Sequence, residues 1–188
     1  LKKIYGKSIL HYIIERLKKV KGNYPIYIAT SNCHSDNPLA DYCEENQIGL
    51  FRGSKSNVAQ RFIDCSIKMN VDYAIRINGD NLFTDPSIID KMITVTKLDK
   101  WLLITNVLER TFPEGVSVEI IKVSYMKKKV CLFNQYEKEH VMPYFYKNLS
   151  RDLIYNHYND EFSNEDNIRL AVDTKTDFSF LSKIFDFM

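Results

Sequence analysis

Glycine and proline are scarce in this sequence, with 6 Gly and 5 Pro in 188 residues, which favours regular elements joined by short connections. An excess of one charge is missing as well, because 26 Lys and Arg oppose 24 Asp and Glu. The net charge of +2 gives no broad basic face, so we expect neither nucleic acid nor a membrane surface as a partner. No apolar run approaches the ~18 residues that span a bilayer.

Cysteines are few and form no metal-binding pattern. The spacing of Cys33, Cys43, Cys65 and Cys131 contains no CxxC pair, which argues against a zinc site. We expect free thiols in a reducing compartment and, since no signal peptide is visible, a cytoplasmic protein. The remaining composition, 45% hydrophobic and 27% charged, is that of an ordinary globular domain and excludes a disordered tail or a collagen-like fibre.

Strand-like and helix-like segments alternate along the first half of the chain. This rhythm predicts βαβ units around a mostly parallel sheet, an α/β fold with helices on both faces. The segment from about 110 to 160 departs from it, and we expect an inserted element there that serves the substrate or a dimer. The predicted strands are 24–30, 48–51, 73–77, 101–106, 116–121 and 168–172, and an extended arm is expected over 153–158. The predicted helices are 9–17, 37–45, 57–69, 86–97, 123–129, 135–147 with a break near Pro143, and 174–187. Ser56 and Asp85 are the predicted caps of 57–69 and 86–97, and Thr174 and Asp177 resemble a capping box.

Two acidic residues directly follow predicted strands. Asp80 comes after YAIRI in Asn78-Gly79-Asp80, and Asp173 comes after IRLAV. Ligands of open α/β sheets bind at the carboxyl ends of the strands, and a pair of carboxylates there is suited to Mg²⁺ beside nucleotide phosphates. The alternative for each acid is local turn or capping chemistry.

Arginines at other strand ends are further candidates. Arg52 and Ser54 lie in a turn after the strand 48–51, where they either contact a nucleotide or merely form a turn with an exposed arginine. Arg76 lies inside a predicted buried strand, which is costly unless an acid or a phosphate pairs with it. Arg61, in the following helix, is read as a surface or interstrand contact.

Seven sequence blocks, in this order, resemble one known family. They are GKSILHYIIERLKK, YIATS, FRGSKSNVAQRF, YAIRINGDNLFTDPSIID, TNVLERTFPEGVSVEII, EKEHVMPYFYK and RLAVDTKTDF. The chain is similar to the cytidylyltransferases that make CMP-sugar acids, and closest to the branch of the spore-coat polysaccharide biosynthesis protein F. The similarity extends from about Leu1 to Phe187.

The resemblance implies a fold, a reaction and a set of site residues. The fold is a three-layer, Rossmann-like nucleotidyltransferase domain, and the reaction joins CMP from CTP to a 2-keto sugar acid, sialic-acid-like or octulosonic, with release of pyrophosphate. A homodimer is also implied, for which the aromatic run 144–146 offers contacts or simply core packing. The implied residues are Asp80 and Asp173 for Mg²⁺ and catalysis, Arg52, Ser54, Arg76 and Gly79 for the nucleotide, and Arg110, Glu119 and His140 for the sugar acid or the dimer.

The sequence also departs from the family pattern. The family's first strand and its phosphate-binding loop belong just ahead of Leu1, so we expect an N-terminally truncated single domain over 1–188. Asn57 and Ser117 stand where the family often has acids. Two alternatives therefore stay open: a nucleotidyltransferase for another nucleotide or acceptor, and a non-catalytic scaffold that retains the fold.

Overall fold

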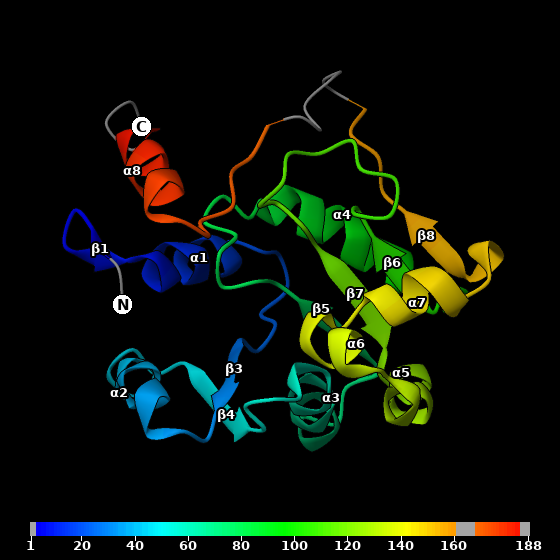
Figure 1. Cartoon of the computed structure of the whole chain (residues 1–188). Helices are drawn as coiled ribbons and strands as arrows, with labels where there is room; N and C mark the ends of the chain where they lie inside the picture. Colours follow the sequence, from blue (N-terminus) through cyan, green and yellow to red (C-terminus); the bar gives the residue numbers. More distant parts are fainter. Residues whose placement is uncertain (1–2, 161–167, 185–188) are drawn as a thin grey trace.

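The computed structural model describes residues 3–160 and 168–184, which form a mixed α/β structure (Figure 1). The strands are β1 (Lys3–Ile4), β2 (Lys7–Ser8), β3 (Tyr27–Ser31), β4 (Gly49–Gly53), β5 (Tyr73–Arg76), β6 (Leu103–Thr105), β7 (Glu119–Lys122) and β8 (Ile154–Asn156). The α-helices are α1 (Ile9–Leu17), α2 (Asn37–Glu45), α3 (Val58–Lys68), α4 (Pro86–Thr96), α5 (Val123–Lys129), α6 (Gln135–His140), α7 (Pro143–Asn148) and α8 (Lys175–Ile184).

The helix starts follow from local capping chemistry. Asp85 accepts a hydrogen bond from the backbone N–H of Ser87 at 2.7 Å, and Pro86 occupies the first turn of α4, as predicted. The prediction that Ser56 caps the next helix upstream is wrong by one residue. Asn57 caps α3 instead, because its Oδ1 accepts from the backbone N–H of Gln60 at 2.9 Å.

The larger sheet has the order β5-β7-β6-β8 and mixed strand directions. β6 and β8 are parallel, as are β3 and β4 in a separate two-stranded sheet, whereas β7 is antiparallel to both of its neighbours. The predicted parallel pairing therefore holds away from β7 and fails at it. The segment 110–160 contributes β7 to the interior of the sheet and β8 to its edge.

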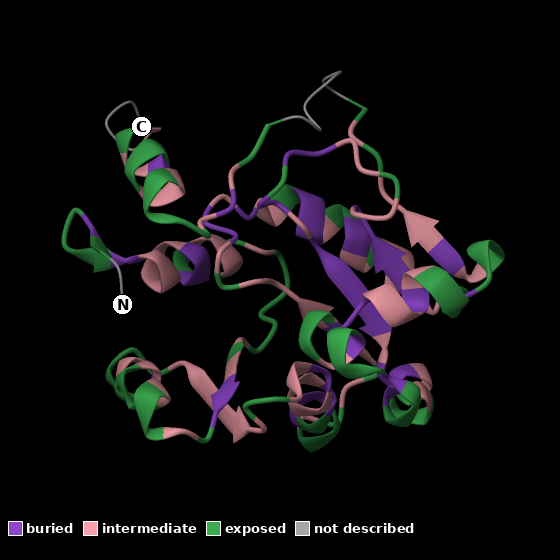
Figure 2. Cartoon of the chain, viewed as in Figure 1, coloured by how far each residue is buried: buried purple, intermediate pink, exposed green. Residues whose placement is uncertain are grey.

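Side chains of consecutive residues enter hydrophobic cores on opposite faces of this sheet. Leu103 and Ile121 share a core with side chains of helices α3, α5 and α7, while Ile104 and Ile120 share a core with side chains of α4. This alternation is the period of a β-strand with both faces covered, and it gives the predicted three layers. Figure 2 shows the buried residues concentrated in these strands and in the helix faces turned toward them.

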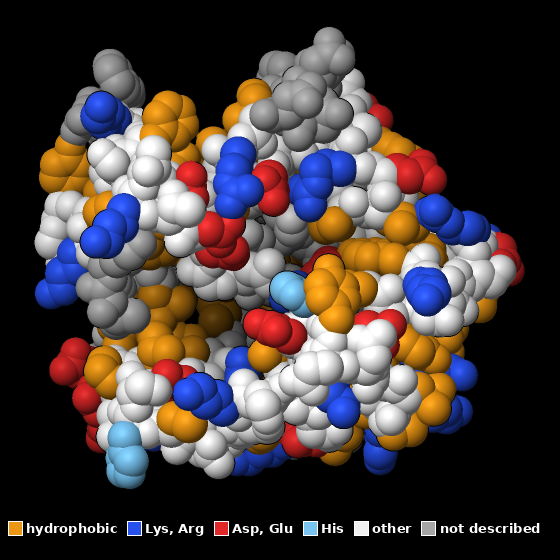
Figure 3. Space-filling view, viewed as in Figure 1, with side chains coloured by type: hydrophobic (Ala, Val, Ile, Leu, Met, Phe, Trp, Pro, Cys, Tyr) orange, Lys and Arg blue, Asp and Glu red, His pale blue; other side chains and the backbone are white. Residues whose placement is uncertain are grey.

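A groove separates the two sheets. Among the described residues, β3 pairs only with β4 and β5 pairs only with β7. The space between them, about 850 Å³, is lined largely by apolar side chains from α1, β3, α3, β5 and α4. The space-filling view shows a hollow with hydrophobic walls in this part of the molecule (Figure 3).

The end of the chain differs from the prediction. A strand over 168–172 is wrong, because a single parallel bridge between Glu114 and Arg169 is the ladder contact found there. The predicted capping box at Thr174 is confirmed: Thr174 Oγ1 accepts from the backbone N–H of Asp177 at 3.0 Å, and Asp177 Oδ2 accepts from the backbone N–H of Thr174 at 2.8 Å. α8 begins at Lys175, and the last residues predicted as helix, 185–187, lie outside the described part.

The structure also shows the state of the cysteines and the length of the apolar helices. All four cysteines are free thiols, with Cys43 and Cys65 buried, as expected. In the described ranges, no helix is long and apolar enough to cross a bilayer.

Candidate active site

Asp80 and Asp173 come together, as the sequence predicted. Asp80 lies in the turn after β5, and Asp173 ends the extended segment before α8. The backbone N–H of Val172 donates to the carbonyl oxygen of Asp80 at 3.2 Å, which fixes the two segments side by side. The Asp173 carboxyl is close enough to Asp80 to act on its pKa.

The Asp80 carboxyl is partly buried, and one of its oxygens has no hydrogen-bond partner in the described part of the chain. Burial raises the pKa of Asp80, and the adjacent Asp173 carboxyl raises it further. Its Oδ1 atom is buried and has no hydrogen-bond partner among residues 3–160 and 168–184. A buried carboxylate oxygen without a donor is unfavourable unless a ligand or a cation contacts it, so the donor set fits a divalent metal ion.

Asp173 is more exposed and has a counter-ion from its own segment. The Arg169 guanidinium bonds Asp173 through one nitrogen and Glu114 through the other, the latter at 3.1 Å. Both ion pairs are about half exposed, and such pairs contribute little to stability. A cation binding at Asp173 therefore displaces Arg169 at small cost.

Gly115 sets how closely this segment approaches the sheet. Its φ is +101°, and a Cβ atom there would collide with the backbone of Leu170 and Ala171. The preceding residue, Glu114, makes two backbone hydrogen bonds to the same segment. Its N–H donates to Ile168 O at 2.9 Å, and its carbonyl oxygen accepts from Leu170 N–H at 2.6 Å. The loop Pro113-Glu114-Gly115 therefore positions the segment that carries Asp173.

The predicted nucleotide residues Arg52 and Ser54 lie at the end of β4. Arg52 donates to Ser31 O, Cys33 O and Asn37 Oδ1 at 3.0, 2.6 and 2.9 Å, so its guanidinium holds the loop after β3. Ser54 Oγ accepts from the backbone N–H of Asn57 at 3.1 Å. Arg61, read from sequence as a surface or interstrand contact, is partly buried and donates to Ser54 O at 2.6 Å. The FRGS turn is thereby tied to α3.

Gly79 and Arg76 face the groove from the next strand. Both line it together with Asn78. Gly79 is exposed, and nothing lies within 4 Å of where a Cβ would be, so there is open space beside the Asp80 turn. Arg76 finds the acidic partner that its burial requires: its Nη1 lies 2.6 Å from Glu119 Oε2.

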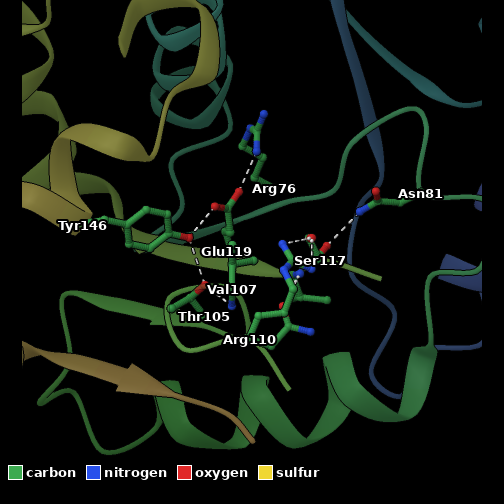
Figure 4. Close-up of polar contacts among 10 residues, drawn as sticks. Arg76, Asn81, Thr105, Val107, Arg110, Ser117, Glu119 and Tyr146 are labelled. Carbon is green, nitrogen blue, oxygen red and sulfur yellow. Dashed lines mark hydrogen bonds and ion pairs between the residues drawn. The ribbon is translucent and has the colours of Figure 1, made fainter. Parts of the chain in front are cut away.

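Glu119 is the centre of a row of polar side chains across three strands (Figure 4). The strand register places it directly opposite both Arg76 on β5 and Thr105 on β6. Tyr146, from α7, bonds Glu119 Oε1 at 2.5 Å and Thr105 Oγ1 at 3.0 Å. Glu119 is buried and both of its oxygens are occupied within the chain.

The remaining predicted sugar residues do not join this row. Arg110 donates to Pro113 O and to Ser117 Oγ at 3.3 to 3.4 Å, and Asn81 Nδ2 donates to Ser117 O at 3.0 Å, which links the Arg110 loop to the Asp80 turn. His140 is exposed at the end of α6, where its ring packs on Tyr136 with a centroid separation of 4.3 Å. Its assignment to the site stays a prediction.

Comparison with known proteins decides the family. The model of a family described as cytidylyltransferase matches residues 1–187. The chain belongs to the cytidylyltransferase family. Its reaction class is therefore nucleotidyl transfer from CTP, and the enzyme class predicted from the sequence blocks is confirmed.

Two curated relatives match almost the whole chain. An uncharacterized protein of Methanocaldococcus jannaschii is 32% identical over 99% of this chain and 77% of its own length. The spore coat polysaccharide biosynthesis protein SpsF of Bacillus subtilis is 26% identical over 98% of this chain and 78% of its own length.

Solved structures agree. A cytidylyltransferase from Leptospira borgpetersenii is 26% identical, with a TM-score of 0.92 over 99% of this chain and 79% of that one. Two less similar structures share the fold alone: a CMP:2-keto-3-deoxy-manno-octonic acid synthetase complexed with CTP (11% identity, TM-score 0.69, 99% and 90% covered) and a Mycobacterium tuberculosis protein in complex with manganese (9%, TM-score 0.65, 97% and 90%).

Sequence reasoning missed two residues that shape this cytidylyltransferase site. Arg169 lies in the RLAVDTKTDF block, and an arginine four residues before a predicted metal acid at a segment end is a usable signal for such a contact. Tyr146 was read as a dimer contact or core residue. Phe145 is fully buried and Tyr146 bonds inward, so the core reading is the correct one for both.

Proposed function

We propose that this chain transfers CMP from CTP to the anomeric hydroxyl of a 2-keto sugar acid and releases pyrophosphate, for surface polysaccharide synthesis. The single observation that carries the proposal is the Asp80–Asp173 pair, in which one buried oxygen of Asp80 lacks a partner within the described ranges. In the reaction the acceptor hydroxyl loses its proton to solvent, and a bond forms between its oxygen and the α-phosphorus. The bond from that phosphorus to the bridging oxygen breaks, and its electrons leave with pyrophosphate.

Asp80 and Asp173 are the residues that would hold Mg²⁺. Carboxylate oxygens are the ligands this ion prefers, and two of them leave coordination positions for phosphate oxygens and water. When bound, the ion supplies positive charge that offsets the charge of the triphosphate. The two acids fix the position of that charge at the end of β5, so the nucleotide is oriented by positioning and electrostatics.

Arg110 suits the acid group of the acceptor. Its guanidinium bonds a carbonyl and a hydroxyl, and no carboxylate pairs with it among the described residues. Arginine binds carboxylates through two parallel hydrogen bonds, which favours an acidic sugar over a neutral one. We assign Glu119 an indirect part in this site, because its oxygens are already bound.

The nucleotide side of the proposal uses the strand ends around the groove. Gly79 leaves space beside Asp80, and the Ser54 hydroxyl hydrogen makes no bond within the described part of the chain, so it is available to a base edge. Arg52 shapes the loop against which the base would rest. We place the reaction in the cytosol, consistent with the four free thiols, and in a homodimer.

We also propose that the inner part of the groove between β3 and β5 holds one more strand of the same domain, the strand that the resemblance implies ahead of Leu1, while the end of the groove beside the Asp80 turn is left for the nucleotide. α2, α3 and α4 each follow a strand of the two sheets, whereas α1, which lines the groove, follows only the short β1–β2 hairpin. A strand parallel to β3 would complete a right-handed βαβ unit through α1. A chain extended by that segment is expected to melt at a higher temperature, and an unchanged melting temperature would contradict the assignment.

The test of function is pyrophosphate release from CTP and Mg²⁺ with a panel of 2-keto sugar acids. We expect release that depends on the acid, and a loss of roughly 10²- to 10³-fold in Asp80→Asn, as for other groups that fix the charge at a reacting centre. Asp64→Asn, an exposed acid on α3, is the matched control and should keep full activity.

The competing functions predict other results in the same assay. Stabilisation of the chain by UTP, GTP or ATP rather than CTP would favour another nucleotide. No stabilisation by any nucleotide and no release with any acceptor would favour the scaffold.

A further inference from the structure

The polar row in the sheet has a single consistent direction of hydrogen bonding. The tyrosine hydroxyl has one hydrogen, and at 2.5 Å from Glu119 Oε1 that hydrogen goes to the carboxylate, which only accepts. Tyr146 must then accept from Thr105, whose own oxygen accepts from the backbone N–H of Val107 at 3.0 Å. The chain of donors therefore runs from Val107 through Thr105 and Tyr146 to Glu119.

This chain of bonds holds the Glu119 side chain between two donors. Tyr146 bonds one oxygen and Arg76 the other, so the carboxylate can rotate only if one of these bonds breaks. Burial and the Glu119 charge raise the pKa of Tyr146, so the phenol stays protonated and keeps donating. Removal of that one hydroxyl frees the carboxylate on the side away from Arg76.

Arg76 is the end of the row that faces ligand space. It lines the groove beside Asn78 and Gly79, and Nη1 makes its one hydrogen bond within the described ranges. Its other donors are therefore available, and its side chain is 19% exposed. Although burial dominates the pKa of Asp80, the Arg76 charge acts on that pKa in the opposite direction, which places the guanidinium within electrostatic reach of the acid pair.

We propose that Tyr146 is a positioning residue for the nucleoside triphosphate: through Glu119 it sets the orientation in which Arg76 presents its free N–H donors to the end of the groove beside the Asp80 turn. This proposal rests on the proposed function, since that end of the groove must receive a nucleotide. It gives the segment 110–160 a defined part in the site, because Tyr146 comes from α7 in that segment and Arg76 from β5. Fixing a donor beforehand lowers the entropy lost when the ligand binds.

The test is the affinity of the full chain for CTP with Mg²⁺, measured by calorimetry. Tyr146→Phe removes the hydroxyl and keeps the ring, and we expect it to weaken CTP about tenfold, the size of one hydrogen bond to a charged group. Tyr144→Phe is the matched control, since Tyr144 lies two residues away and packs its ring on Phe133. Its affinity should stay within about twofold of the parent.

A double-mutant cycle separates positioning from a merely structural effect. Arg76→Gln should weaken CTP at least as much as Tyr146→Phe, and in the Arg76→Gln background the tyrosine change should add less than about twofold. Thr105→Val, which interrupts the row further from Arg76, should weaken CTP in the same direction and serves if Tyr146→Phe does not fold.

Three outcomes are distinguishable. A parent chain that binds no CTP overturns the proposed function, and this proposal with it. A parent that binds CTP while Tyr146→Phe behaves like Tyr144→Phe overturns the positioning role alone. So does a tyrosine effect of equal size with and without Arg76.

Discussion

Two groups of polar side chains meet at the end of β5: the row of Arg76, Glu119 and Tyr146, and the rim formed by Asp80 and Asp173. They differ in how many of their polar atoms are hydrogen-bonded within the chain. In the row of Arg76, Glu119 and Tyr146, every oxygen of the acid has a partner within the chain. At the rim, Asp80 has a buried oxygen with no partner among the described residues, and the ion pair of Asp173 in the same ranges is with exposed Arg169. We infer that the row contributes stability and orientation, whereas the rim is left for a ligand.

The largest expected effect comes from breaking the row. Glu119→Leu leaves Arg76 without its acid and Tyr146 without its acceptor, so the free energy of unfolding should fall by about 3 kcal/mol, the lower end for buried pairs because Arg76 is partly exposed. Urea unfolding measures this change. The double variant Arg76→Met with Glu119→Leu should recover most of the loss, and a single-variant loss below about 1 kcal/mol would show that the row is not a stability element.

A smaller effect is expected from moving the rim without touching the row. Gly115→Ala places a side chain at a positive φ and against the backbone of residues 170 and 171, so it should cost about 2 kcal/mol. Because the displaced segment carries Asp173, metal affinity should fall as well. Gly6→Ala, also at positive φ but in open space, is the control that carries the backbone strain without the displacement. Equal metal affinity in both variants would contradict the role given to Gly115.

The smallest effect on stability is expected at the exposed ion pair of the rim. Arg169→Gln should change the free energy of unfolding by less than about 1 kcal/mol. It should raise the affinity for Mn²⁺ by up to about fivefold, because the cation no longer displaces an arginine from Asp173. Arg151→Gln, which removes a similarly exposed pair with Glu109, should leave Mn²⁺ affinity unchanged. A lower affinity in Arg169→Gln would mean that the arginine assists the cation.

Sequence reasoning reached the rim but not the row, for a physical reason. Asp80 and Asp173 each follow a predicted extended segment, and the carboxyl ends of such segments meet at one edge of an α/β sheet, so their convergence followed from local pattern. Arg76, Glu119 and Tyr146 are far apart in the chain, and their meeting depends on antiparallel register at β7. That register was not predictable, since the alternation of the first half indicated parallel pairing.

The helix starts show the same division. Pro86 after Asp85 identifies one cap without ambiguity, whereas Ser56 and Asn57 are adjacent and both can cap, so only the backbone decides between them. The segment 168–172 has the composition of a strand. The loop Pro113-Glu114-Gly115 beside it, however, forms a single β-bridge with it instead of a continuous ladder of strand pairing.

The most direct test of the account is a titration of the full chain with Mn²⁺, a cation that takes the same oxygen ligands as Mg²⁺, followed by electron paramagnetic resonance. We predict one Mn²⁺ site in the parent chain and in Asp64→Asn, and loss of that site in both Asp80→Asn and Asp173→Asn. Unchanged Mn²⁺ binding in either of the last two variants would show that these carboxylates do not share a metal ion.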